Sequence, residues 1–178
     1  MFMSLIQKRR SIRQFQDKAI ETEKIDRLAE AALRAPSSRG FNPWQFVFVT
    51  DRDMLDRLSR AKPHGASFLK GAALGIVVCA DPSKSDVWVE DASIATIMLL
   101  LAAESLDLGG CWIQIRERRH SEGKMAQDYI RELLNIPKEL QVEAIVAAGY
   151  PAEQKAPHSQ EELQFEKVHR GVYGKAYK

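Results

Sequence analysis

The sequence contains only two cysteines, Cys79 and Cys111, and each lies within an apolar run. A disulfide framework is therefore not expected, and two buried, reduced thiols are the default interpretation. The most apolar stretch, residues 94–103, is too short to span a bilayer and is flanked by Asp91 and Glu104. The N-terminus lacks the order of charged and apolar residues that a signal peptide needs. We therefore expect a cytoplasmic protein without a membrane segment.

The chain also lacks a clear excess of either charge, because 26 Lys and Arg residues face 24 Asp and Glu residues. That balance disfavours a general nucleic-acid-binding protein, which would show a strong basic excess. Neither G-x-G-x-x-G after a predicted strand nor a Walker-type G-x-x-x-x-G-K occurs, which disfavours a Rossmann dinucleotide pocket. The histidines are scattered without H-x-x-x-H or C-x-x-C pairing, so no metal site is expected.

The apolar pattern predicts helices that alternate with strands, and no linker or repeat divides the chain. We expect one domain over residues 1–178, of which 152–178 form an extended polar tail. The predicted helices cover 4–10, 22–35, 51–61, 87–106 and 121–134, with Thr22 as the cap of the second. The predicted strands cover 45–50, 74–80, 111–116 and 143–149. This content indicates an α/β or α+β protein, and periodicity alone does not choose between the two.

The predicted helix over 87–106 is apolar on most of its circumference. Such a helix lies either at the centre of a core or in an interface, and both interpretations stay open for a chain of this length. Gly109 and Gly110 follow the helix, where a left-handed residue that ends it is expected.

Two polar segments are candidates for binding a ligand. Residues 8–13, K-R-R-S-I-R, combine clustered cations with a hydroxyl, and arginine forks match the oxygens of phosphate. A solvated basic helix end explains the same residues, although Ile12 would anchor the segment. Residues 35–46, A-P-S-S-R-G-F-N-P-W-Q-F, are either an ordinary turn or a loop whose hydroxyls reach a polar ligand.

The two segments together resemble the nitroreductase family of FMN enzymes. R-R-S-I-R-x-F at 9–15 is followed by A-P-S-S-x-x-x-N-P-W-x-F at 35–46, in the family's order and spacing. The helix that carries E-D-A-S at 90–93 runs into L-G-G-C-W at 108–112, as the family's long central helix does. E-A-I-V-A-A-G-Y-P at 143–151 resembles the last core strand, and F-E-K-V-H at 165–169 resembles the basic C-terminal segment.

The resemblance implies an α+β fold with a central, mainly antiparallel sheet flanked by helices, in a domain-swapped homodimer with FMN at the subunit interface. It implies an oxidoreductase that transfers a hydride from NAD(P)H through FMN to a small acceptor, such as a nitro compound or quinone, in a ping-pong cycle. Because the flavin supplies the chemistry, no acid–base side chain is required. A flavin-binding or storage protein of the same fold without turnover is the alternative.

Carried over residue by residue, the resemblance also implies the cofactor contacts. Arg9, Arg10 and Ser11 would contact the FMN phosphate and ribityl chain, and Arg13 would lie at the pyrimidine edge of the ring. Trp112, Ile113 and Gln114 would line the ring, and Lys167 and His169 would contact the phosphate. Pro36, Ser37 and Ser38 would reach the flavin from the partner subunit. A cation at the position of Arg13 would stabilise negative charge on the reduced ring. Two departures weaken the match: Gly40 and Asn42 stand where the family often has Asn and Gln, and His169 stands where it often has Arg.

Overall fold

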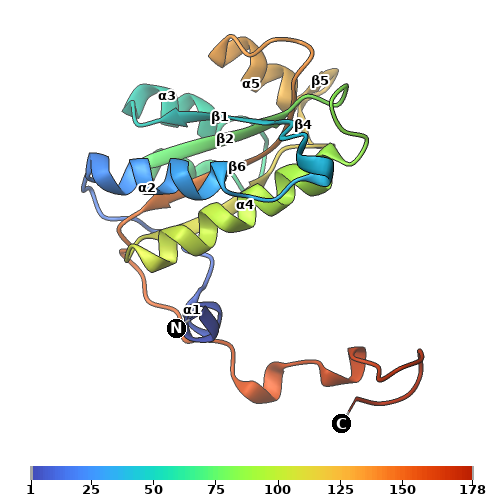
Figure 1. Cartoon of the computed structure of the whole chain (residues 1–178). Helices are drawn as coiled ribbons and strands as arrows, with labels where there is room; N and C mark the ends of the chain where they lie inside the picture. Colours follow the sequence, from blue (N-terminus) through green and yellow to red (C-terminus); the bar gives the residue numbers. More distant parts are fainter. Residues whose placement is uncertain (1, 178) are drawn as a thin grey trace.

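The computed structural model describes residues 2–177, so the two ends of the predicted 1–178 domain lie outside this range. At the centre of the molecule is a four-stranded antiparallel sheet with the strand order β1-β2-β6-β3 (Figure 1). The strands are β1 (Trp44–Val49), β2 (Leu74–Ala80), β6 (Gln141–Gly149) and β3 (Gly109–Gln114). Helices lie on both faces of this antiparallel sheet, which confirms the predicted α+β class.

The two faces of the sheet carry separate apolar cores. The helices are α2 (Thr22–Leu33) and α4 (Trp88–Ser105) on one face, and α3 (Arg52–Ser59) and α5 (Ala126–Leu134) on the other (Figure 1). Side chains alternate between the faces of a strand, so Ile76 joins the first core and Val77 the second. Every residue of β2 is buried as a result, which explains why its sequence is a continuous apolar run and why the predicted strand over 74–80 matches β2.

The long helix α4 confirms the helix predicted over 87–106 and is apolar for two reasons. Its buried side, which includes Leu99 and Ala103, packs on the sheet and on α2. On its other side Ile94 and Ile97 remain 37% and 41% exposed. The helix therefore belongs to the core along one side and presents uncovered apolar side chains along another.

The predicted ends of two helices are wrong. Glu21, not Thr22, precedes α2 as its N-cap, and no side-chain capping bond forms there. After α4 the left-handed residue is Asp107, with a φ of 60°, whereas Gly109 and Gly110 lie inside β3. A short polar residue tolerates this backbone conformation, so glycine is not required at the turn.

The start of the helix predicted over 121–134 is also wrong, because α5 begins only at Ala126. The residues before it form a short hairpin of β4 (Arg119–Ser121) and β5 (Lys124–Met125). Gly123 makes the turn of this hairpin with a φ of 79°, a conformation that glycine adopts without strain.

The chain ends in the predicted extended tail. Its only helical features within residues 152–177 are the single turns Gln160–Glu162 and Phe165–Lys167. The tail leaves the sheet near α1 (Phe2–Lys8) and leads away from the body of the molecule (Figure 1). Between residues 2 and 177, no helix combines the length and the apolar character that crossing a membrane requires.

Candidate functional site

The basic N-terminal segment is fixed on the edge of the sheet. Ser11 forms a parallel bridge with Gly110, and the backbone N–H of Ile12 donates to the Gly110 carbonyl at 3.1 Å. The Ile12 side chain is buried, and a Cβ on Gly109 would lie only 2.8 Å from the Cβ of Ile12. Because Gly109 has no side chain, the backbone at Ile12 can approach the backbone of β3 closely. The N-terminal segment is therefore packed against the edge strand of the sheet.

Cations from this segment gather around Cys111. Burial raises the pKa of the Cys111 thiol, whereas the charges of Arg13, Lys155 and Arg9 act on it in the opposite direction. The Arg13 guanidinium lies 5.8 Å from the centre of the Phe68 ring. Within residues 2–177, neither Arg9 nor Arg13 forms an ion pair with a carboxylate, so their charge is available to an anion.

Lys155, which no sequence motif singles out, holds this cluster together. Its ammonium donates to the Ser11 carbonyl at 2.6 Å and lies 3.3 Å from Glu153. Glu153 also accepts the backbone N–H of Arg13 at 2.5 Å, so the carboxylate binds the backbone and leaves the arginine side chain free of an ion pair. Arg10 turns the other way and donates to the Ala156 carbonyl in the tail.

The Trp112 and Gln114 side chains of β3 form a wall on the α4 side of the sheet, which is the face opposite to Cys111. Trp112 and Gln114 are partly exposed and face the same side, and the Trp112 indole N–H donates to the Gln114 side-chain oxygen at 2.8 Å. Ile113 points to the opposite core and is 1% exposed, so only its backbone is available on this side. Of the three residues predicted to contact the ring, Trp112 and Gln114 thus present their side chains on this side of β3, and Ile113 presents only its backbone.

Glu143 supports this wall from β6, a role that its place in an ordinary strand pattern does not reveal. Its carboxylate accepts from the Gln114 amide at 3.2 Å, and its carbonyl accepts the N–H groups of both Ile115 and Arg116. The side chain is 3% exposed, and within residues 2–177 its second oxygen has no hydrogen-bond partner. Burial raises the pKa of Glu143, and the hydrogen bond from Gln114 partly opposes that shift.

The loop with Pro36, Ser37 and Ser38 is built separately from the cluster. The Ser38 N–H donates to Asp91 at 2.7 Å, and the buried Asp91 also accepts from Ser85 at 2.7 Å. Ser37 shares two hydrogen bonds with Asn42, which gives Asn42 a structural role inside the loop.

Within one chain this loop does not meet the N-terminal segment. Ser38 lies beside Asp91 in the first turn of α4, whereas a Cβ on Gly110 would contact Leu100 and Ala103 near its end. At 1.5 Å of rise per residue, these positions are about 14–18 Å apart along the helix. Pro36, Ser37 and Ser38 therefore form a second, distant half of any shared site.

Lys167 and His169 are not brought to the cluster by their own chain. Both lie in the tail that leads away from the body (Figure 1), where His169 bridges Ala176 and its ring lies 4.5 Å from the Tyr173 ring. In the same chain it is Lys155, and not Lys167 or His169, that lies against the N-terminal segment, through its contact with the Ser11 carbonyl.

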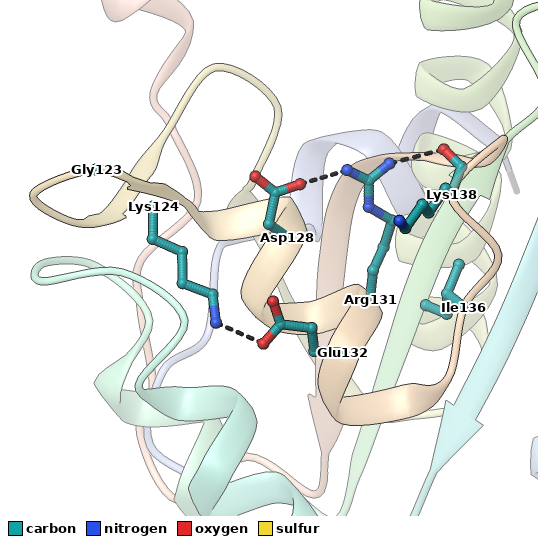
Figure 2. A pocket seen from close by; sticks show the side chains of 7 residues that line it. All are labelled: Gly123, Lys124, Asp128, Arg131, Glu132, Ile136 and Lys138. Atoms are coloured by element: carbon teal, nitrogen blue, oxygen red, sulfur yellow. Dashed lines mark hydrogen bonds and ion pairs between the residues drawn. The ribbon is translucent and has the colours of Figure 1, made fainter.

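In another hollow, beside α5, two of the lining cations form ion pairs with carboxylates that also line it. It measures about 620 Å³, and Figure 2 shows Arg131 between Asp128 and the Lys138 carbonyl, with Lys124 against Glu132. These charges satisfy one another, in contrast to Arg9 and Arg13. Among residues 2–177, no group of His, Cys, Asp and Glu side chains is arranged to hold a metal ion.

Comparisons with known proteins point to one family. The model of the nitroreductase family matches residues 6–63 and 55–150. A relative from Archaeoglobus fulgidus, whose name includes the words NADH dehydrogenase and NAD(P)H nitroreductase, is 41% identical over 86% of this chain and 87% of its own. The solved FMN-dependent nitroreductase from Clostridium difficile R20291 superposes with a TM-score of 0.94 at 44% identity, covering 96% of this chain and 99% of that one. A structure from Desulfovibrio desulfuricans in complex with FMN superposes with a TM-score of 0.76 at 27% identity, covering 97% of both chains.

Proposed function

Since the chain belongs to the nitroreductase family, we propose that it is a single-domain, FMN-dependent oxidoreductase that works as a homodimer. It would accept a hydride from NAD(P)H and pass it to a small acceptor, such as a nitro compound or a quinone, in a ping-pong cycle. FMN, when bound, supplies the hydride chemistry, and the protein positions the reactants and sets the charge around them.

The observation that carries this proposal is the unpaired charge on the docked N-terminal segment. Arg9 and Arg13 are held next to β3 without a carboxylate partner among residues 2–177, and the Ser11 hydroxyl lies between them in sequence. Such a group of donors fits FMN, because the Arg9 guanidinium and the Ser11 hydroxyl match the oxygens of its phosphate, which leaves the Arg13 guanidinium for its ring. The isoalloxazine ring would then lie against the β3 backbone at Trp112, Ile113 and Gln114, with the hydrogen-bonded Trp112 and Gln114 side chains on the α4 side of the strand.

Each residue has a definite part in this proposal. Arg9, Arg10 and Ser11, now joined by Lys155, would hold the phosphate and ribityl chain. Arg13 would stand at the ring, where its positive charge favours the reduced, more negative flavin. Trp112, Ile113 and Gln114 would line the ring and exclude water from it.

The second subunit would complete the site with Pro36, Ser37 and Ser38. The distance of this loop from the N-terminal segment along α4 supports a contribution from a different copy of the chain. The exposed Ile94 and Ile97 of α4 support an apolar subunit interface beside it. Lys167 and His169 would act on the partner's flavin, since the tail leads away from its own cluster (Figure 1).

The decisive experiment is spectroscopic. The purified protein should be yellow, and anaerobic addition of NADH or NADPH should bleach the flavin absorbance. A colourless protein that takes up no FMN would refute both the enzyme and the flavin-storage alternative. Colour that neither nucleotide bleaches would favour the storage protein.

Arg13→Ala tests the proposed division of labour within the basic segment. We expect it to slow flavin reduction more than it weakens FMN binding, because Arg13 would act on the ring and not on the phosphate. Arg13→Lys, which keeps the charge, should recover much of the rate. Rapid-reaction spectroscopy and FMN titration measure the two effects, and equal losses in both would show that Arg13 is misplaced. Sizing of the FMN-loaded protein tests the shared site, which a stable monomer would contradict.

A further inference from the structure

A second basic hollow lies on the α3 side of the sheet, outside the residues assigned to the flavin. It has a volume of about 450 Å³ between the end of α3, the turn Ser67–Gly71 and the hairpin strand β4. Its basic lining residues are Arg60, Lys62, Lys70 and His120, and we call it the Lys62 pocket.

Most of the positive charge in the Lys62 pocket has no internal partner. Arg60 pairs with Asp56, but within residues 2–177 neither Lys62 nor Lys70 forms an ion pair. Lys62 is partly buried, and its pKa is lowered by burial and then by the nearby charge of Arg118. A partly buried ammonium beside a second cation is unfavourable by itself, and a bound anion would compensate it.

The wall of this pocket is held in place by His120. The Nδ1 atom of its ring lies 3.0 Å from the Arg60 carbonyl and 3.2 Å from the Ala61 carbonyl, so Nδ1 carries a hydrogen and donates. The ring also stacks on Tyr129 with a centre-to-centre distance of 4.1 Å. These contacts tie β4 to the end of α3, which keeps the two sides of the pocket at a set separation.

The Lys62 pocket adjoins the proposed flavin site. Phe68, within the turn that borders the pocket, lies against Arg13. A ligand whose reactive end lies at Arg13 could therefore place an anionic group, several ångströms away in the same molecule, in the Lys62 pocket.

We propose that the Lys62 pocket binds the diphosphate of the reduced nicotinamide dinucleotide while its nicotinamide end reaches the flavin. The proposal rests on the proposed function and names the site that recognises its electron donor. Two unpaired lysines match the two negative charges of a diphosphate, and lysine binds phosphate as a point charge. The chain carries no Rossmann phosphate loop that would bind this diphosphate instead.

Binding of ADP-ribose, which carries the diphosphate but no nicotinamide, tests the pocket without any turnover. Calorimetric titration of the FMN-supplemented wild-type protein should show saturable binding. The double variant Lys62→Gln/Lys70→Gln should weaken it about tenfold or more, the loss of one or two charge-assisted contacts. The control Lys84→Gln/Lys138→Gln removes the same charge elsewhere and should bind as the wild type does. Absence of saturable binding to the wild type, or equal losses in both variants, would overturn the proposal.

Turnover separates a failure of this proposal from a failure of the proposed function. With NADH or NADPH, kcat/KM of Lys62→Gln/Lys70→Gln should fall about 10- to 100-fold, whereas with uncharged 1-benzyl-1,4-dihydronicotinamide it should stay within about twofold. Equal losses with both donors would overturn the phosphate site, because the lysines would then act on the flavin or on the fold. If neither donor reduces the wild-type flavin, the proposed function fails, and the ADP-ribose titration still decides whether the pocket binds a diphosphate.

Discussion

Gly109→Ala should detach the basic segment from the sheet, because no side chain fits between β3 and Ile12. An added Cβ would lie 2.8 Å from both Cβ and Cγ2 of Ile12 and 2.9 Å from its Cγ1. Rotation of the Ile12 side chain cannot relieve the contact with its Cβ, so the backbone of the segment must move. That movement would stretch the 3.1 Å hydrogen bond from Ile12 to Gly110 and displace Arg9 and Arg13 with it.

The expected magnitude follows from these contacts. Overpacking in a core costs about 1–3 kcal/mol, and a weakened backbone hydrogen bond adds up to about 1 kcal/mol. Urea unfolding should therefore show a loss of about 1–4 kcal/mol in the free energy of unfolding. If the same displacement opposes cofactor binding, the FMN Kd should rise by about tenfold or more, which titration of flavin fluorescence measures.

Gly71→Ala is the matched control, because a Cβ at Gly71 would have no atom within 4 Å and its φ is ordinary. We expect it to change neither the unfolding free energy nor FMN binding appreciably. Ile12→Ala combined with Gly109→Ala should not restore FMN binding, since the Cβ of residue 12 remains. If Gly109→Ala behaves like Gly71→Ala in both measurements, the close approach of the two backbones does not position the site.

Three further perturbations address the neighbouring residues. Lys155→Ala should raise the FMN Kd about fivefold or more by removing the contact with the Ser11 carbonyl, as measured by flavin titration; an unchanged Kd would exclude Lys155 from the site. Burial raises the pKa of the Glu143 carboxyl above its ordinary value of 4.5, so the folded state binds the carboxyl proton more tightly than the unfolded state does. The wild type therefore loses stability as the pH rises from about 4.5 through the higher pKa of the folded state. Glu143→Gln should remove this loss, so its unfolding free energy relative to the wild type should be higher at about pH 8 than at about pH 4, and a constant difference would contradict a buried, protonatable carboxyl. Leu28→Ala, in the core between α2 and α4, should cost about 2–5 kcal/mol in urea unfolding without changing the FMN Kd of the folded protein.

The parts of the fold that were predictable from sequence are those in which one strong local pattern decides the structure. The strand over 74–80 is apolar throughout because both of its faces are covered, and the amphipathic pattern of α2 and α3 follows from one buried side. The hairpin before α5 was missed because β4 and β5 are too short to show a period of two residues, so its charged residues read as the first turns of a helix.

The candidate site was predictable only as far as its residues cluster in sequence. Residues 9–13 form a basic group that composition reveals, and their docking on β3 is consistent with Ile12 as an anchor. Lys155 and Glu143 could not be found in this way, because their roles depend on contacts with Ser11 and Gln114 made between distant parts of the chain. Which lysine of a polar tail lies beside the sheet is decided by tertiary structure and not by local pattern.

The balance of charge over the whole chain conceals a strongly unbalanced distribution at the site. Glu153 is the acidic residue that is hydrogen-bonded to the docked segment. Its Oε1 atom accepts the backbone N–H of Arg13 and pairs with the Lys155 ammonium. Among residues 2–177 the guanidinium groups of Arg9 and Arg13 consequently have no carboxylate partner, and they lie near Cys111, a thiol whose pKa is raised by burial. A protein gains nothing in stability from holding such cations close together, since like charges repel. Their arrangement therefore supports the proposal that this site receives an anion, although the net charge of the whole chain is only +2.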